Sequence, residues 1–256
     1  MAKEVISQKS LAGLRVGTVE EKDSFLNILI YGNPGAGKTV LAGSADKVPE
    51  MRPVLVVDVE AGTESLRNTY PGVETVRVTN WKQMQDVYNE LYAGGHGFNT
   101  VVLDSLTEIQ KFSMYNIMTE LVAKKEDADP DVPGMREWGK NIEQIRRFVR
   151  GFRDLQMNTI FTALMKSDKD SKSGVTTMKP YLSGKLADEV AGFLDIVVYY
   201  YVKQIGTNED ATFKRLLLTQ ATEQQVAKDR TGQLPMIIED PTMEVLYKYM
   251  TSTPNS

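Results

Sequence analysis

The stretch Gly32-Asn-Pro-Gly-Ala-Gly-Lys38-Thr39 decides the fold of this 256-residue chain. It satisfies the pattern G-x-x-x-x-G-K-[ST] at every fixed position, and the apolar run at residues 25–31 comes directly before it. Such a short run, rich in Leu and Ile, predicts a buried parallel strand, and the residues after Thr39 predict a helix. Glycines let the backbone curl until several N–H groups point at one phosphate, next to the positive end of that helix. The stretch therefore predicts a phosphate-binding loop, or P-loop, for a nucleotide.

Two side chains of this loop have separate roles in the hypothesis. The ammonium group of Lys38 reaches the β- and γ-phosphates, and the Thr39 hydroxyl is a ligand for Mg²⁺. The alternative is a glycine turn that only joins a strand to a helix. The residues expected to contact the nucleotide are Gly32, Asn33, Pro34, Gly35, Ala36, Gly37, Lys38, Thr39 and Val40.

Two carboxylates follow other apolar strands. Asp104 ends the run Val101-Val-Leu-Asp104, where an aspartate can support Mg²⁺ through a water; otherwise it caps the next helix. Glu60 follows the strand Val56-Val-Asp58-Val and can orient or deprotonate the attacking water. Asp58 competes with Glu60 for that role, and a solvated loop carboxylate is the remaining interpretation of Glu60.

Composition excludes several other classes of site. Hydrophobic residues make up 41% and charged residues 25%, as in ordinary globular proteins. The chain has no cysteine and one histidine, His96, which excludes disulfides, thiol nucleophiles and multi-histidine metal sites. No apolar run approaches the ~20 residues that span a bilayer, and the N-terminus lacks a signal-peptide core. We expect a cytoplasmic protein without membrane contact, and the net charge of −4 excludes a strongly basic nucleic-acid coat.

Strands and helices alternate through the first two-thirds of the chain, which predicts an α/β fold with a mainly parallel sheet flanked by helices. The expected strands in this part lie at 25–31, 54–58, 73–78, 100–104 and 158–165, and the helices at 81–92, 106–123 and 136–155. A polar loop is expected at 167–179. The last third predicts helices at 184–193 and 241–250 and strands at 195–202, 213–219 and 225–228, which add antiparallel strands near the C-terminus. Residues 1–23 are expected to be an N-terminal arm, and 24–256 a single domain.

The motifs resemble those of the RecA-like ATPases. Within them, the chain is similar to phage-encoded nucleotide-binding proteins of the AAA-domain type, some of which are single-strand annealing recombinases. The similarity covers residues 26–246 and includes the spacing of 22 residues from Lys38 to Glu60 and the strand that ends in Asp104-Ser105. Lys228-Asp-Arg230-Thr-Gly232 resembles the Lys-Asn-Arg-Phe-Gly signature of the bacterial RadA branch.

This resemblance implies a RecA-like P-loop NTPase core that uses ATP and Mg²⁺. It implies that Lys228 and Arg230 reach a neighbouring subunit's ATP site, which requires self-association into a ring or filament. Residues two apart on an extended segment project to the same side, but two solvated cations are the simpler interpretation of the spacing alone. The expected catalytic set is then Lys38, Glu60, Lys228 and Arg230.

The resemblance also implies single-stranded DNA as a partner, with a single-strand-binding protein as a further one. In the family, DNA lies along loops after strands four and five, and the matching loop is 167–179. The cations expected to contact DNA there are Lys166, Lys169, Lys172 and Lys179, although a solvated loop explains them equally well. Trp138 and Tyr181 are interpreted as packing residues.

One feature departs from the family pattern. RecA recombinases carry a glutamine at the end of strand five, whereas this strand is Ile160-Phe-Thr-Ala-Leu-Met-Lys166, so that Thr162 or Lys166 would have to replace it. The hypothesis is a RecA-like ATPase that hydrolyses Mg·ATP and acts on single-stranded DNA in phage-type recombination or annealing, in a bacterial host. The alternatives are a helicase-like or loader-type DNA motor core, and a nucleotide-gated binding module with little hydrolysis.

Overall fold

A parallel sheet organises the molecule. The computed structural model describes residues 10–12, 14–15, 25–169, 174–206 and 211–251. The parallel strands lie in the order β9-β3-β7-β6-β4-β5. Their bounds are β3 Asn27–Gly32, β4 Val54–Asp58, β5 Glu74–Arg77, β6 Thr100–Asp104, β7 Asn158–Lys169 and β9 Ile196–Ile205. The strand that precedes the P-loop, β3, therefore lies between β7 and β9, away from the sheet edges.

Antiparallel strands extend this sheet, as expected for the last third of the chain. The strand expected at 195–202 among them is β9, however, and it is parallel to β3. Strand β10 (Thr212–Leu218) pairs with β9, and the two-residue β11 (Lys228–Asp229) pairs with the start of β9. Strand β12 (Ile237–Glu239) pairs with β10 and was not expected, because three residues are too few to show a period. A separate two-stranded sheet, β1 (Ser10–Leu11) with β2 (Leu14–Arg15), falls within the expected arm, most of which lies outside the described residues.

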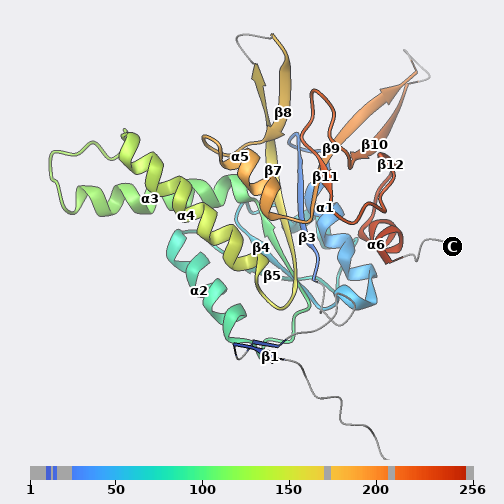
Figure 1. Cartoon of the computed structure of the whole chain (residues 1–256), viewed down its shortest axis with the longest axis horizontal. Helices are drawn as coiled ribbons and strands as arrows, with labels where there is room; N and C mark the ends of the chain where they lie inside the picture. Colours follow the sequence, from blue (N-terminus) through green and yellow to red (C-terminus); the bar gives the residue numbers. More distant parts are fainter. Residues whose placement is uncertain (1–9, 13, 16–24, 170–173, 207–210, 252–256) are drawn as a thin grey trace, which may run out of the picture.

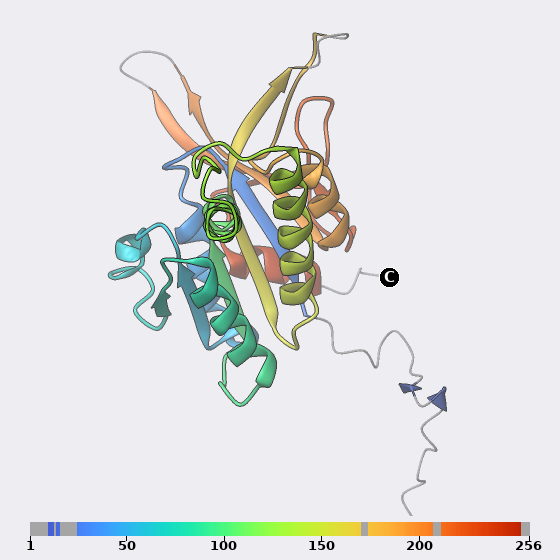
Figure 2. The ribbon, with the colours of Figure 1, turned by 90° about the vertical axis from the view of Figure 1, so that its left-hand side faces the viewer.

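Helices cover both faces of the sheet (Figures 1 and 2). One face packs against α2 (Trp81–Ala93), α3 (Leu106–Val122), α4 (Met135–Arg153) and α5 (Leu186–Phe193). The other packs against α1 (Lys38–Gly43), α6 (Met243–Thr251) and the short helices η1 (Ser44–Lys47) and η2 (Pro49–Met51). The short helix η3 (Thr63–Leu66) follows β4. No helix in the described ranges has both the length and the apolar character needed to cross a membrane.

Strand β3 shows how the sequence creates these two cores. Successive side chains of a strand point to opposite faces, so an unbroken apolar run buries both faces. Leu29 and Tyr31 pack in the core beneath α2–α5, whereas Ile28 and Ile30 pack in the core beneath α1 and α6. All four side chains are fully buried, and this packing on both faces fixes the position of β3 and of the P-loop that follows it.

The expectation of a loop at 167–179 is wrong, because most of this segment forms a β-hairpin. Strand β7 continues to Lys169 and pairs antiparallel with β8 (Thr176–Pro180), from Met165 opposite Pro180 to Lys169 opposite Thr176. Its polar composition indicated a loop, but a two-stranded ribbon that leaves the sheet has no core to cover and tolerates polar residues on both faces. The hairpins β7–β8 and β9–β10 both project beyond the parallel sheet (Figures 1 and 2).

Candidate nucleotide-binding site

The P-loop follows β3 closely because of two glycines. A Cβ atom on Gly32 would lie 2.0 Å from the backbone oxygen of Tyr200, so only glycine allows β9 to pair at this point. Gly37, directly before α1, has φ = 100°, a conformation that favours glycine. The sequence therefore needs glycine at the ends of the loop for reasons of space and backbone conformation.

Lys38 lies folded across the loop. Its Nζ atom donates hydrogen bonds to the backbone oxygens of Gly32 (3.2 Å) and Asn33 (3.0 Å). Burial lowers the pKa of Lys38 below the ordinary lysine value of 10.5, while the nearby carboxylates of Asp104 and Glu60 oppose that shift. The ammonium group thus stands among carbonyl and carboxylate oxygens at the place where the motif predicts phosphate.

Thr39 and Asp104 form the expected metal pair. The Thr39 hydroxyl donates to Asp104 Oδ2 at 2.6 Å, and Thr162 donates its hydroxyl to the other carboxylate oxygen of Asp104. The Asp104 side chain does not cap α3, since Ser105 occupies the N-cap position without a side-chain bond. Mg²⁺ prefers hard oxygen ligands and usually takes one or two from the protein, with waters and phosphate oxygens completing its shell. The hydroxyl of Thr39 and the carboxylate of Asp104 fit such a site, and Thr162 holds the carboxylate in place.

Glu60 and Asp58 separate clearly in the structure. Glu60 is exposed and accepts a hydrogen bond from the hydroxyl of Ser105, the residue after Asp104. Asp58 is buried and accepts from Arg77 (3.2 Å), the backbone N–H of Gly62 and the Thr63 hydroxyl. Asp58 therefore has a full set of structural partners. Glu60 is the carboxylate near Lys38, at the edge of the sheet where the P-loop lies.

Lys228 and Arg230 lie away from their own P-loop. Lys228 pairs in register with Val197, near the start of β9, whereas Gly32 pairs with Tyr200. The Lys228 ammonium donates to the last carbonyls of α5, with the oxygen of Leu194 nearest at 2.8 Å. The β9 residues opposite Lys228 and Gly32, Val197 and Tyr200, are three residues apart, which corresponds to roughly 10 Å along the sheet. Neither cation reaches the nucleotide site of its own chain.

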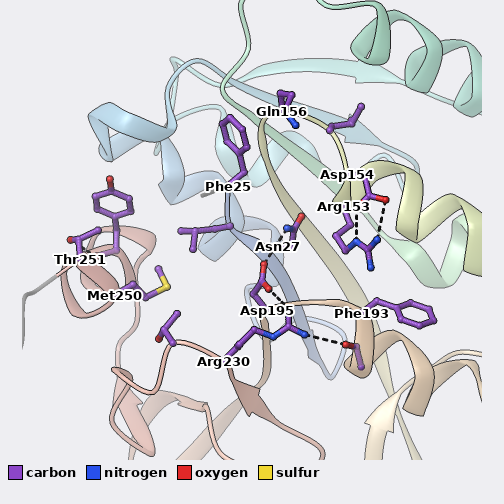
Figure 3. A pocket seen from close by; sticks show the side chains of 15 residues that line it. Phe25, Asn27, Arg153, Asp154, Gln156, Phe193, Asp195, Arg230, Met250 and Thr251 are labelled. Atoms are coloured by element: carbon purple, nitrogen blue, oxygen red, sulfur yellow. Dashed lines mark hydrogen bonds and ion pairs between the residues drawn. The ribbon is translucent and has the colours of Figure 1, made fainter. Parts of the chain in front are cut away.

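Arg230 lines a depression of about 760 Å³ at the amino-terminal ends of the parallel strands (Figure 3). Its guanidinium forms an ion pair with Asp195 at 2.6 Å and donates to the oxygen of Gly192 at 3.3 Å. Asp195 also accepts from the side chain of Asn27 at 3.1 Å. Because Lys228 also donates to Gly192, the two cations lie on one side of their segment, as the spacing predicted.

Three of the four lysines expected to contact DNA lie on or beside the β7–β8 hairpin, and Lys172 lies outside the described residues. Lys179 forms an ion pair with Asp168 at 2.8 Å, and Lys166 donates to the oxygen of Leu182 at 2.5 Å. Lys169 is exposed on β7. Two residues were expected to replace the missing strand-five glutamine. The Thr162 hydroxyl is buried and donates to Asp104, and the Lys166 ammonium donates to Leu182, so both groups are already engaged within the chain.

The interpretation of Tyr181 and Trp138 as packing residues is wrong. Tyr181 is 52% exposed and Trp138 is 41% exposed, and together with Tyr115 they border a pocket of about 180 Å³. Tyr181 follows the hairpin, Trp138 lies on α4 and Tyr115 on α3. Their positions in the sequence gave no sign that three separate elements would gather aromatic rings at one surface.

Two further residues beside the P-loop were missed. Tyr200 on β9 and Arg215 on β10 both approach Gly37. Phe213, Arg215 and Leu217 alternate along β10, and a cation in that otherwise apolar row is the signal that sequence analysis could have used.

Comparison with known proteins gives a family match over most of the chain. The profile of a family described as an AAA domain matches residues 24–231. No curated protein sequence matches the chain. Among solved structures, the chain is similar to the assembled ATPase EscN of the enteropathogenic E. coli type III secretion system, with 18% identity and a TM-score of 0.44 over 69% of this chain and 43% of EscN.

Two other solved structures show similar levels of likeness. One is a prototypical type III secretion ATPase from pathogenic bacteria, with 16% identity and a TM-score of 0.42 over 68% of this chain and 50% of that protein. The other is the pCW3 conjugation coupling protein TcpA with ATPγS, with 11% identity and a TM-score of 0.35 over 68% and 49%. The chain thus spans half or less of the length of each of these three proteins.

Proposed function

Since the chain belongs to the family described as an AAA domain, we propose that it is a RecA-like P-loop ATPase that hydrolyses Mg·ATP and acts on single-stranded DNA in phage-type recombination or annealing. The observation that carries the ATPase part is the convergence of Lys38, Thr39, Asp104 and Glu60 at the carboxyl ends of β3, β6 and β4. The DNA part rests on the motif resemblance and on the surface beside that edge. The proposed setting is the cytoplasm of a bacterial host.

Each residue of the site has one role in this proposal. Lys38 neutralises charge on the β- and γ-phosphates, and Thr39 and Asp104 would hold a metal ion, which would supply further positive charge to these phosphates when bound. Glu60 orients the attacking water and accepts its proton, while Ser105 fixes the carboxylate. Thr162 replaces the strand-five glutamine only as a support for Asp104.

Self-association follows from the position of Arg230 and Lys228. Both lie at the opposite end of the sheet from their own P-loop, so they can act only in the ATP site of a second copy. An interface that joins two different surfaces of one protein is heterologous and builds a ring or a filament. Arg230 exchanges Asp195 for the γ-phosphate of the neighbour in this proposal, as an arginine finger supplied in trans.

Single-stranded DNA fits the surface near the start of α3, where Thr107 lines the pocket bordered by Tyr115, Trp138 and Tyr181. Exposed rings there offer stacking to bases, which is worth about 1–3 kcal/mol per base, and Lys166, Lys169 and Lys179 lie along the neighbouring hairpin. Tyr181 follows that hairpin directly, and Lys166 lies 6.0 Å from the centre of its ring. A single-strand-binding protein remains a proposed further partner.

The test is steady-state ATP hydrolysis with and without single-stranded DNA, with duplex DNA for comparison. We expect single strands to stimulate hydrolysis. Lys38→Ala abolishes it, and Glu60→Gln lowers it by about a hundredfold or more while ATP still binds. If neither single-stranded nor duplex DNA stimulates hydrolysis, the DNA proposal is wrong and the protein is an ATPase with a protein partner.

Two outcomes identify the alternatives. Near-zero turnover that Glu60→Gln does not change indicates a nucleotide-gated binding module. Strand separation of a forked duplex, driven by ATP, indicates a helicase-like motor core instead of an annealing protein.

A further inference from the structure

Arg215 reaches the P-loop from a strand two positions away in the sheet. It pairs in register with Val202, while Leu217 pairs with Tyr200, which itself pairs with Gly32 at the end of β3. Arg215 therefore lies two residues beyond the level at which β3 ends. It lies on the same face of β10 as Leu217, whose side chain packs in the core beneath α1 and α6.

The Arg215 side chain lies against the turn that precedes α1. A Cβ atom built on Gly37 would lie 3.5 Å from Arg215 Nε and 3.7 Å from the Tyr200 hydroxyl oxygen. Burial raises the pKa of Tyr200, and the positive charge of Arg215 opposes that shift, as expected for neighbouring groups. A guanidinium and a phenol thus border the P-loop on its β9–β10 side.

Arg215 differs from the cation beside it. Lys214 points to the other face of β10 and forms an ion pair with Glu239 at 2.6 Å. In the part of the chain that the structure describes, no carboxylate lies within ion-pair distance of the Arg215 guanidinium. Asp240, the residue after β12, instead accepts from the backbone N–H of Arg215 at 3.4 Å. The arginine is exposed, permanently charged and shaped to bind phosphate oxygens in pairs.

We propose that Arg215 binds the α-phosphate end of the nucleotide from within the same chain. Asp104 ends β6 and Glu60 follows β4, so the γ-phosphate lies on the β7 side of β3. The other end of the nucleotide then extends toward β9 and β10, where Arg215 and Tyr200 border the loop. The inference rests on the proposed nucleotide site, but it concerns neither hydrolysis nor DNA.

The test compares the dissociation constants of Mg·ADP and Mg·ATP by calorimetry for the wild type, Arg215→Met and Lys214→Met. ADP retains the α-phosphate and lacks the γ-phosphate. We expect Arg215→Met to weaken both nucleotides about tenfold and by the same factor, because a hydrogen-bonded charge is lost in each complex. Lys214→Met, one residue along the same strand, should bind both like the wild type. Thermal unfolding of each variant confirms that the fold is retained.

The outcomes separate this inference from the wider proposal. Wild-type dissociation constants for Arg215→Met overturn the inference and leave the ATPase intact. Weakening confined to ATP also overturns it, since the contact would then be to the γ-phosphate. A wild-type protein that binds neither nucleotide overturns the proposed function itself.

Discussion

At the scale of a residue, the chemistry of the site depends on the charge of Lys38. Burial lowers the pKa of this lysine, and the phosphates of a bound nucleotide raise it again. Between the two pKa values the complex holds a proton that the free protein lacks. Nucleotide affinity should therefore fall as the pH rises through the pKa of the free protein, which lies below 10.5.

Proton uptake measures this linkage directly. Over a series of alkaline pH values up to 10.5, where the phosphates of ATP are already ionised, calorimetry in two buffers of different ionisation enthalpy should show proton uptake when Mg·ATP binds. Lys38→Arg is the matched control, because a guanidinium keeps its charge and should show none. Equal uptake by both proteins would assign the proton to another group and contradict the assigned role of burial at Lys38.

At the scale of an element, one hydroxyl joins β3 to two later segments. Tyr31 is fully buried, and its hydroxyl donates to the backbone oxygen of Val226 at 2.6 Å, with the backbone oxygen of Met178 on β8 a second acceptor at 3.1 Å. Tyr31→Phe leaves these oxygens without the hydroxyl and should lower the free energy of unfolding by about 1–3 kcal/mol. Urea denaturation at neutral pH measures this loss, and Tyr201→Phe, at a half-buried ring on β9, should cost less than about 0.5 kcal/mol.

The same tyrosine makes stability depend on alkaline pH. Burial, the largest effect, raises the pKa of Tyr31 well above its ordinary value of 10.0. The unfolded chain ionises near that ordinary value, so the contribution of Tyr31 is present below pH 10.0 and is lost progressively at higher pH. The difference in stability between the wild type and Tyr31→Phe should therefore shrink above pH 10. A constant difference would show that the hydroxyl is not the group responsible.

Elements were predictable where a local period existed. The parallel strands and α2, α3 and α4 lie where their apolar runs and 3.6-residue periods place them. The β7–β8 hairpin was missed because its residues are polar on both sides, and β12 because it is too short. These elements are fixed by their partners in the sheet, and no such partner is visible within one stretch of sequence.

At the scale of the whole molecule, the candidate site was predictable only where a motif fixes its geometry. Lys38, Thr39, Asp104 and Glu60 each follow a strand of one parallel sheet, and parallel strands bring their carboxyl ends to one edge. Arg215 and Tyr181 belong to no motif. Arg215 reaches the P-loop only because β10 folds back beside β9, and Tyr181 reaches its aromatic pocket only because β8 folds back beside β7. Sheet topology, which the local pattern does not contain, decides both positions.

The position of Arg230 predicts how subunits combine in an assembly. If Arg230 acts in the ATP site of a second copy, as proposed, each complete ATP site combines two copies, because the P-loop and Arg230 lie at opposite ends of the sheet. Lys38→Ala removes the loop function of a subunit and keeps its Arg230, whereas Arg230→Ala does the reverse. Each variant alone should hydrolyse ATP at least about a thousandfold more slowly than the wild type.

A mixture of these two inactive variants should regain activity. In a mixed assembly, some interfaces place the intact P-loop of an Arg230→Ala subunit against the intact Arg230 of a Lys38→Ala subunit. With equal amounts and random assembly, about one interface in four is of this kind, so the mixture should approach a quarter of the wild-type rate. Dilution below the concentration at which the subunits associate should abolish the recovery. A mixture as inactive as its components, while light scattering shows that they co-assemble, would mean that Arg230 serves only its own chain by holding Asp195 at the start of β9.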